Sequence, residues 1–113
     1  MLFRSLEQRL AKGLAHITGG GITDNLPRIL PEGCAAEIDR RAWPLPPVFQ
    51  LLQQLGRISG DEMYRTFNMG IGLVIVCESR EAERVLDSLR QAGEPRAVRI
   101  GQVVSGDRGV AYI

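Results

Sequence analysis

Apolar residues recur at helical spacing in three long stretches of the chain. The first stretch predicts an amphipathic helix that ends near Lys12-Gly13 and covers one face of a sheet. The second predicts a helix that begins at Pro47 and ends at Gly56, because proline suits the first helical position and glycine the end. The third predicts a helix with Ser79 as its cap and Gly93 after its last turn. The three apolar stripes are Leu2, Phe3, Leu6 and Leu10; Val48, Leu51, Leu52 and Leu55; and Ala82, Val85, Leu86 and Leu89.

Shorter apolar stretches predict strands at residues 14–18, 34–39 and 71–77. The third of these is apolar on both faces, which is typical of a central strand covered on both sides. Val98, Ile100 and Val104 precede a Gly-Asp-Arg-Gly turn, so we expect the chain to end in a hairpin that includes residues 110–113. A short helix with Pro27 in its first turn, stopped by Pro31, is also expected; its apolar side is Leu26, Ile29 and Leu30.

Helices mixed with strand signals in this way predict an α+β fold, or a mixed α/β sandwich. The 113 residues fit one domain, which buries roughly two-thirds of the surface of the unfolded chain. Charged residues make up 24% and the net charge is +1, so we expect neither nucleic acid nor a membrane as a partner. No apolar run is long enough to span a bilayer and no leader is recognised, so a cytoplasmic location is expected.

The two cysteines, Cys34 and Cys77, lie far apart in the sequence and in apolar surroundings. Neither belongs to a Cys-x-x-Cys or a Cys/His pattern. We therefore expect buried, reduced thiols rather than a disulfide or a zinc site.

The triplet Gly19-Gly20-Gly21 separates the strand at 14–18 from the short helix. Such a triplet can present a run of backbone N–H groups at a positively polarised helix end, which would bind an anion. A flexible turn explains the same residues equally well.

Polar residues beside the triplet are candidates for chemistry. His16 is the only histidine, which excludes a histidine-rich metal site and limits any catalytic dyad to His16 with a carboxylate or a hydroxyl. A hydrogen-bonded structural role at the end of a strand is the alternative for His16. Asp24 and Asn25 are more often helix caps than ligands.

A second polar segment occupies residues 60–72. Arg65, Thr66 and Asn68 are good donors to phosphate or amide oxygens, and they stand directly before Gly70 and Gly72, which allow a close approach to the backbone. This order of residues favours a position at the edge of a binding site. A turn in which Asn68 and the glycines adopt positive φ remains the alternative.

The segment His16-Ile17-Thr18-Gly19-Gly20-Gly21, followed by residues 25–31, resembles the opening of the C-terminal domain of phosphoribosylformylglycinamidine cyclo-ligase, also called AIR synthetase. Residues 62–72 resemble the second signature of the same domain, and Trp43 with its prolines fits the pattern as well. The resemblance runs from about Leu14 to the C-terminus. It implies an AIR-synthetase-like domain in which a mixed sheet is packed with helices, partly like a ferredoxin fold.

The resemblance also implies a role in purine biosynthesis. The family cyclises formylglycinamidine ribonucleotide to aminoimidazole ribonucleotide while ATP is converted to ADP and phosphate. The amide oxygen would be activated by phosphoryl transfer, and an internal amine would then close the ring. The complete enzyme would use ATP and Mg²⁺ and form a homodimer.

Carried over by residue, the resemblance implies three groups of site residues. Gly19, Gly20 and Gly21 would cradle the phosphate of the ribonucleotide substrate or a neighbouring anion, with His16 near the reacting amidine or the ATP phosphates. Arg65, Thr66 and Asn68 would line a cleft facing the family's N-terminal domain. Gly70 and Gly72 would provide backbone clearance. No metal ligand is expected in this chain.

The N-terminal half, which in the family carries much of the nucleotide and metal binding, has no counterpart in these 113 residues. The chain alone is therefore expected to lack turnover and to bind neither ATP nor Mg²⁺ tightly, and its partner would be the N-terminal domain, in cis or in trans. Two alternatives remain open. One is a non-catalytic ribonucleotide-binding or interaction module, and the other is a fragment of the related formylglycinamide ribonucleotide amidotransferase.

Overall fold

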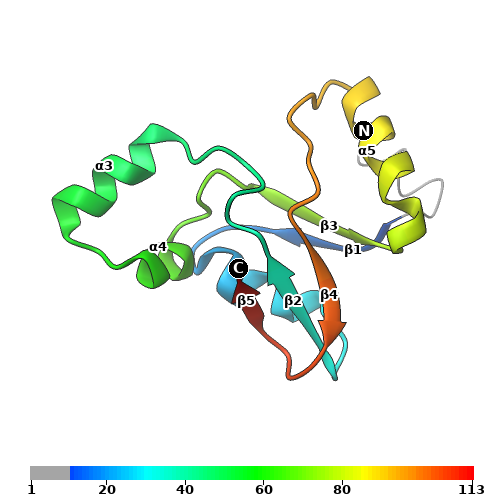
Figure 1. The fold of residues 1–113 in the computed structure, drawn as a ribbon, viewed down its shortest axis with the longest axis horizontal. Helices are drawn as coiled ribbons and strands as arrows, with labels where there is room; N and C mark the ends of the chain where they lie inside the picture. The colour runs from blue at the N-terminus through cyan, green and yellow to red at the C-terminus, as the bar shows by residue number, and fades with distance from the viewer. Residues whose placement is uncertain (1–10) are drawn as a thin grey trace.

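The computed structural model describes residues 11–113, which form an α+β fold with two small sheets between two helical ends (Figure 1). The N-terminal helix expected over residues 2–12 lies almost entirely outside the described residues. Its last two positions were predicted wrongly, because Ala11 and Lys12 belong to strand β1 (Ala11–His16). Pairing of Ala11 with Cys77 extends this strand beyond the start that its apolar pattern predicts.

The first sheet consists of β1 and β3 (Leu73–Cys77), which run antiparallel. The prediction of a central strand covered on both sides is wrong for β3 as described. Within residues 11–113 it has β1 as its single neighbour, and Leu73 is 37% exposed. Only Val74 of this strand is buried, on the face that β3 shares with Ala15.

The second sheet has the order β4-β2-β5, formed by β2 (Cys34–Ile38), β4 (Gly101–Ser105) and β5 (Val110–Tyr112). The predicted C-terminal hairpin is wrong, because β4 and β5 do not pair with each other. Instead β2 lies between them, antiparallel to β4 and parallel to β5. The connecting turn passes around the start of β2, where the Gly106 N–H donates to the Gly33 carbonyl and the Ala36 N–H donates to the Gly109 carbonyl.

The short helix predicted around Leu26 is divided into α2 (Gly21–Asn25) and a 3₁₀ turn, η1 (Pro27–Ile29). Proline has no N–H for the α-helical ladder, so the helix tightens at this residue, and the Leu30 N–H donates to the Pro27 carbonyl. The core is formed where these turns meet both sheets. Its fully buried side chains include Ile17, Ile22, Leu26, Met63 and Met69.

Helix α3 (Pro47–Gly56) has the predicted bounds, and Arg57 ends it in the left-handed conformation at φ 51°. It lies at one end of the molecule, away from both sheets (Figure 1). Helix α4 (Gly60–Thr66) follows. It was not predicted, although its Ser59 cap accepts a hydrogen bond from the Glu62 N–H, as a Ser-x-x-Glu capping sequence allows.

Helix α5 (Ala82–Gln91) lies at the opposite end of the molecule, beside the end of β3 (Figure 1). Ser79 is not its cap: Ser79 begins a 3₁₀ turn, η2 (Ser79–Glu81), and Glu81 is the N-cap residue, without a side-chain capping bond. The predicted stop is correct. Gly93 has φ 103°, and the N–H groups of Gly93 and Glu94 donate to carbonyls of the last helical turn.

Candidate functional site

The glycine triplet forms a tight loop between β1 and α2. Gly20 and Gly21 both have positive φ, at 96° and 61°, a conformation that residues with a Cβ atom rarely adopt. The Gly21 N–H donates to the Thr18 carbonyl at 2.9 Å, so this amide is already used inside the loop. A Cβ atom on Gly21 would also collide with the Tyr64 carbonyl and lie 2.5 Å from the Phe67 carbonyl. Gly21 therefore allows α2 to approach the end of α4.

Gly19 differs from the other two glycines in its surroundings. A Cβ atom built on it meets no atom within 4 Å, and its φ lies outside the left-handed range. It is exposed, as is Thr18 before it. Of the three glycines, Gly19 is thus the one whose backbone faces open space.

The second polar segment forms helix α4 and a sharp turn after it. The Asn68 Oδ1 accepts a hydrogen bond from the Gly70 N–H at 2.8 Å, and Met69 adopts a left-handed conformation at φ 55°. Trp43, buried in the core, donates from Nε1 to the Met69 carbonyl at 3.0 Å. The indole of Trp43 thus holds the turn through a contact between residues that are distant in the sequence. The sequence alone does not predict this role for Trp43.

These two segments meet at a shallow hollow of about 390 Å³. Its walls offer hydroxyl, amide and backbone groups beside two aromatic rings, those of Phe49 and Phe67, whose centroids are 6.0 Å apart. The lining residues are Thr18, Gly19, Phe49, Thr66, Phe67 and Asn68. Residues nearly fifty positions apart in the sequence therefore supply hydrogen-bonding groups to one concave surface, as a binding site for a polar ligand requires.

Four other candidate residues do not line this hollow. His16 is exposed on β1, where it pairs with Leu73, and Arg65 is exposed on α4. Gly20 and Gly21 follow Gly19 in the loop. None of these four is in the wall of the hollow.

Gly70 and Gly72 face a different part of the molecule. The φ of Gly70 is 95°, and a Cβ atom on it would lie 2.8 Å from Pro46, so the clearance it provides is toward the connector before α3. The Gly72 carbonyl accepts a hydrogen bond from the Ile17 N–H at 3.0 Å, which ties the second segment to the strand before the glycine loop. Both glycines line the larger groove described next.

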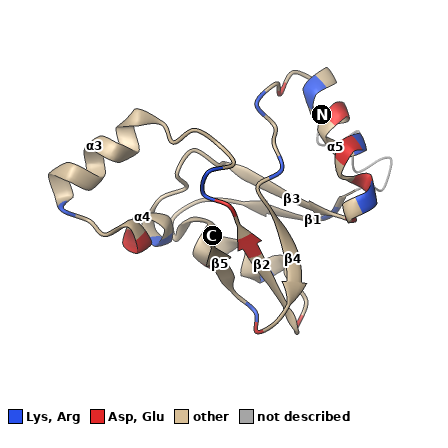
Figure 2. Ribbon diagram, in the orientation of Figure 1, with Lys and Arg blue, Asp and Glu red and all other residues tan. Residues whose placement is uncertain are grey.

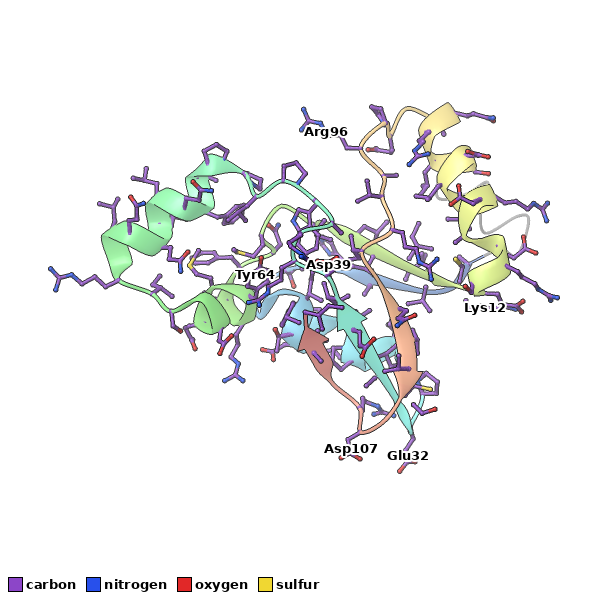
Figure 3. All side chains as sticks on the ribbon, in the orientation of Figure 1. Lys12, Glu32, Asp39, Tyr64, Arg96 and Asp107 are labelled. Atoms are coloured by element: carbon purple, nitrogen blue, oxygen red, sulfur yellow. The ribbon has the colours of Figure 1, made fainter. Side chains whose placement is uncertain are left out.

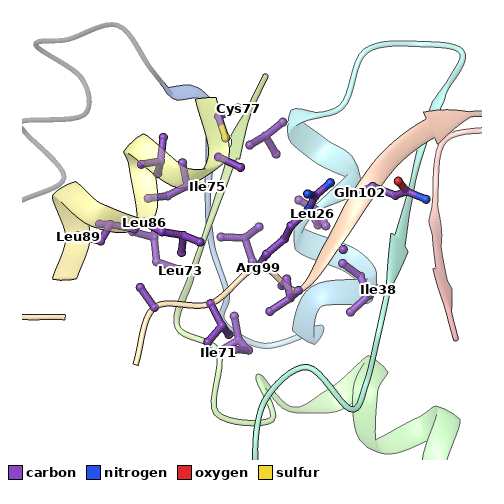
Figure 4. Close-up of a pocket in the computed structure, with 18 of the residues that line it drawn as sticks. Leu26, Ile38, Ile71, Leu73, Ile75, Cys77, Leu86, Leu89, Arg99 and Gln102 are labelled. Atoms are coloured by element: carbon purple, nitrogen blue, oxygen red, sulfur yellow. The ribbon is translucent and has the colours of Figure 1, made fainter. Parts of the chain in front are cut away.

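A groove of about 870 Å³ runs between the β3–α5 side of the molecule and β4 (Figure 4). Leu73, Leu86 and Leu89 project into it from β3 and α5, and Arg99 and Gln102 approach from the other wall (Figure 4). Its walls are mainly apolar. Of the candidate site residues, this groove includes Gly70 and Gly72, whereas the smaller hollow includes Gly19, Thr66 and Asn68 and so joins both motifs.

A pair of tyrosines lies beside α2, in contact with Thr23. Tyr64 projects from α4 toward the centre of the molecule (Figure 3), and its ring centroid is 4.8 Å from that of Tyr112. The Tyr112 hydroxyl is 2.8 Å from the Thr23 Oγ1. Burial raises the pKa of both phenols above their ordinary value, and the Thr23 hydrogen bond offsets part of that rise for Tyr112.

Cys34 and Cys77 are free thiols, and both are half-buried rather than fully buried. Burial raises the pKa of the Cys77 thiol, which disfavours its reactive thiolate. Residues 11–113 contain no group of three or more His, Cys, Asp or Glu side chains able to hold a metal ion. No helix in this described range is both long and apolar enough to cross a membrane.

Comparison with known proteins identifies the family. Residues 2–113 match the model of the AIR synthase related protein, C-terminal domain. The chloroplastic phosphoribosylformylglycinamidine cyclo-ligase of Arabidopsis thaliana is 51% identical over 107 residues, which are 95% of this chain and 27% of that protein. The cyclo-ligase of Chromobacterium violaceum is 53% identical over 102 residues, 90% of this chain and 29% of the relative. The chain therefore spans less than a third of the length of these relatives.

Solved structures agree on the fold. The crystal structure of E. coli HypE, a hydrogenase maturation protein, matches 98% of this chain and 34% of its own, with a TM-score of 0.70 and 28% identity. The thiamine-monophosphate kinase of Stenotrophomonas maltophilia matches 93% of this chain and 32% of its own, with a TM-score of 0.61; at 15% identity this likeness concerns the fold alone. Because the family model matches residues 2–113, almost the whole chain, the chain belongs to the family of AIR synthase related proteins, as their C-terminal domain.

Proposed function

We propose that residues 1–113 are the substrate-side, C-terminal domain of a phosphoribosylformylglycinamidine cyclo-ligase. The complete enzyme would close the imidazole ring of aminoimidazole ribonucleotide from formylglycinamidine ribonucleotide, with ATP as the second substrate. The observation that carries this proposal is identity of about half with cyclo-ligases over 87–95% of the chain. Both polar segments meet at one hollow, which supports the same assignment.

The hollow would bind the ribonucleotide through its phosphate. Gly19 offers an exposed backbone, while Thr66 and Asn68 offer a hydroxyl and an amide from the opposite wall. Gly20 and Gly21 would hold the shape of this phosphate cradle through their positive φ angles. His16 and Arg65, both exposed and outside the hollow, would contact the bound ligand from the rim of the hollow.

ATP and Mg²⁺ would be held largely outside this chain. Magnesium at such sites is usually held by one or two carboxylates together with substrate phosphates. Residues 11–113 contain no group of three or more His, Cys, Asp or Glu side chains that could hold a metal ion. No step of the reaction is assigned to the metal here. The chain's own contribution would be to bind and orient the ribonucleotide.

Helix α3 offers a surface for the rest of the enzyme. Its ten residues carry no charge (Figure 2), and Val48, Leu51 and Leu55 are 54%, 53% and 75% exposed. An exposed apolar face of this kind marks an interaction site. Because Phe49 of the same helix also lines the hollow, a domain that covered α3 would approach the substrate site at the same time.

We propose that the occupant of this α3 face is the N-terminal portion that the relatives have in addition, either in cis or in trans. The relatives are more than three times as long as the segment matched here, which leaves ample chain for such a domain. A homodimer of the complete enzyme is part of the same proposal.

The proposal is tested by measuring ATP-dependent formation of aminoimidazole ribonucleotide. The 113-residue chain should show no turnover alone and should gain turnover when mixed with the separately produced N-terminal portion of the Chromobacterium violaceum relative. A matched mixture containing Leu51→Gln/Leu55→Gln tests the α3 face. Turnover by the chain alone at a rate near that of a complete cyclo-ligase would contradict the proposal. Ribonucleotide binding without turnover in any mixture would instead favour a non-catalytic binding module.

A further inference from the structure

Asn25 is a buried polar residue, 6% exposed, beneath the glycine loop. It is not the cap of α2, because Gly20 holds that position. Its Nδ2 atom donates to the Gly21 carbonyl at 2.8 Å and the Gly19 carbonyl at 3.2 Å, with a longer contact of 3.4 Å to the Thr18 carbonyl. One side chain thus contacts three carbonyl groups of the loop, while the Gly20 carbonyl accepts from the Asp24 N–H.

The partners of Asn25 also fix which way its amide faces. Carbonyl oxygens only accept hydrogen bonds, whereas a guanidinium only donates them. Three carbonyls surround Nδ2, and the Arg28 Nη1 donates to the Asn25 Oδ1 at 3.3 Å. An aspartate of the same shape would place an oxygen against the loop carbonyls, so the loop requires an amide at this position.

Peptide geometry extends this contact to the outer surface of the loop. The described chain contains no cis peptide bond, and in a trans peptide unit the C=O and N–H groups point in opposite directions. The carbonyls of Thr18 and Gly19 point toward Asn25. The N–H groups of Gly19 and Gly20, which belong to the same two peptide units, therefore point away from it. Gly19 is open to its surroundings, whereas the Asp24 side chain lies beside Gly20.

We propose that Asn25 is a positioning residue of the substrate site: it sets the direction in which the Gly19 and Gly20 N–H groups are presented. The inference rests on the proposed function, in which the loop receives the phosphate of the ribonucleotide. It assigns to Asn25 a role distinct from helix capping and from direct contact with the ligand. Its effect on binding is transmitted through two backbone amides.

The test is a titration of the ¹⁵N-labelled 113-residue chain with inorganic phosphate, monitored by the amide resonances of the loop. In the wild type, the Gly19 and Gly20 resonances should shift with phosphate. Asn25→Ala and Asn25→Asp should each weaken phosphate binding by about five- to tenfold or more. The alanine variant adds no charge, so a loss in both variants separates positioning from repulsion between aspartate and phosphate.

Loss of stability is controlled by Val85→Ala, which truncates a buried side chain of α5 far from the loop. It should lower the midpoint of urea denaturation as the Asn25 variants do, yet leave phosphate affinity unchanged. If an Asn25 variant fails to fold, Arg28→Gln is titrated instead; it keeps all three Nδ2 contacts but removes the guanidinium that orients the amide, and a weaker phosphate response is expected.

The outcomes separate the two proposals. The role of Asn25 would be overturned if the wild type binds phosphate at Gly19 and Gly20 and folded Asn25→Ala binds it with the same affinity. Unchanged affinity in Arg28→Gln would have the same meaning where that variant replaces Asn25→Ala. In both cases the phosphate site would remain. If the wild-type loop resonances do not respond to phosphate, the phosphate site of the proposed function fails, and the positioning role fails with it. Loss of affinity in the Asn25 variants but not in Val85→Ala supports both.

Discussion

Gly21→Ala is expected to destabilise this domain strongly, whereas Gly19→Ala, two residues earlier, is not. Gly21 has φ 61° and lies where an added Cβ atom would meet the Tyr64 carbonyl and the Phe67 carbonyl, the latter at 2.5 Å. Both obstacles are backbone atoms at the end of α4, so a side-chain rotation cannot relieve the collision. α2 and α4 would have to move apart.

The magnitude follows from two terms. A left-handed conformation costs a residue with a Cβ atom about 1–2 kcal/mol, and overpacking of a tight contact costs about 1–3 kcal/mol more. Gly21→Ala should therefore lower the free energy of unfolding by about 2–5 kcal/mol, a large part of the roughly 5–15 kcal/mol that stabilises a domain. At about 4 °C per kcal/mol for a domain of this size, Tm should fall by about 8–20 °C.

The assay is urea denaturation of the wild type and both variants, followed by circular dichroism. At Gly19 an added Cβ atom meets nothing within 4 Å, so Gly19→Ala should change the free energy of unfolding by less than about 1 kcal/mol. The reasoning would be refuted if Gly21→Ala unfolded within about 0.5 kcal/mol of the wild type, or if the two variants were equally destabilised.

Three further predictions concern Trp43, Leu55 and Tyr112. Trp43→Phe removes the donor to the buried Met69 carbonyl, so the free energy of unfolding in urea should fall by about 1–3 kcal/mol; an unchanged midpoint would count against this contact. Leu55→Gln should alter that free energy by less than about 0.5 kcal/mol, because Leu55 is 75% exposed, yet it should weaken the turnover of the mixture with the N-terminal portion severalfold. Burial raises the pKa of Tyr112 above 10.0, so above this pH the unfolded chain loses the phenol proton first and the free energy of unfolding falls. Urea titrations from pH 9 upward should show a smaller fall of this free energy for Tyr112→Phe. Equal slopes for the two proteins would contradict the assignment.

Local signals predicted some elements well. The bounds of α3 follow from Pro47 and Gly56, which start and stop a helix by their own backbone properties. The sequence spacing could not reveal that the apolar stripe of α3 is exposed, because burial depends on what packs against a helix. The Ser59 and Glu62 pair is a local capping signal for α4, because the Glu62 N–H donates to the Ser59 Oγ.

Non-local pairing accounts for the two errors in the sheets. A turn between two apolar stretches is equally compatible with a hairpin and with strands that flank a third strand, and here β2 occupies the place between β4 and β5. The apolar run of β3 likewise predicts burial without specifying neighbours. Leu73 borders the large groove, and the described part of the chain supplies one strand beside β3.

The candidate site was predictable in its chemistry and less so in its geometry. The glycine triplet and the Thr66–Asn68 segment contain groups that bind anions, and Gly19, Thr66 and Asn68 meet in the hollow. The alternation along β1 could have shown that His16 faces away from the buried Ala15 and Ile17. The contribution of Phe49 depends on the path of the chain after Trp43, for which the sequence contains no local rule.

A crystal structure of the 113-residue chain with formylglycinamidine ribonucleotide is the most direct test of where the substrate is held. The phosphate is expected against the backbone of Gly19 and Gly20, within hydrogen-bonding reach of Thr66 or Asn68. A well-occupied ribonucleotide whose phosphate lay only elsewhere, such as beside Arg99 in the apolar groove, would contradict the assignment of the hollow as the substrate site.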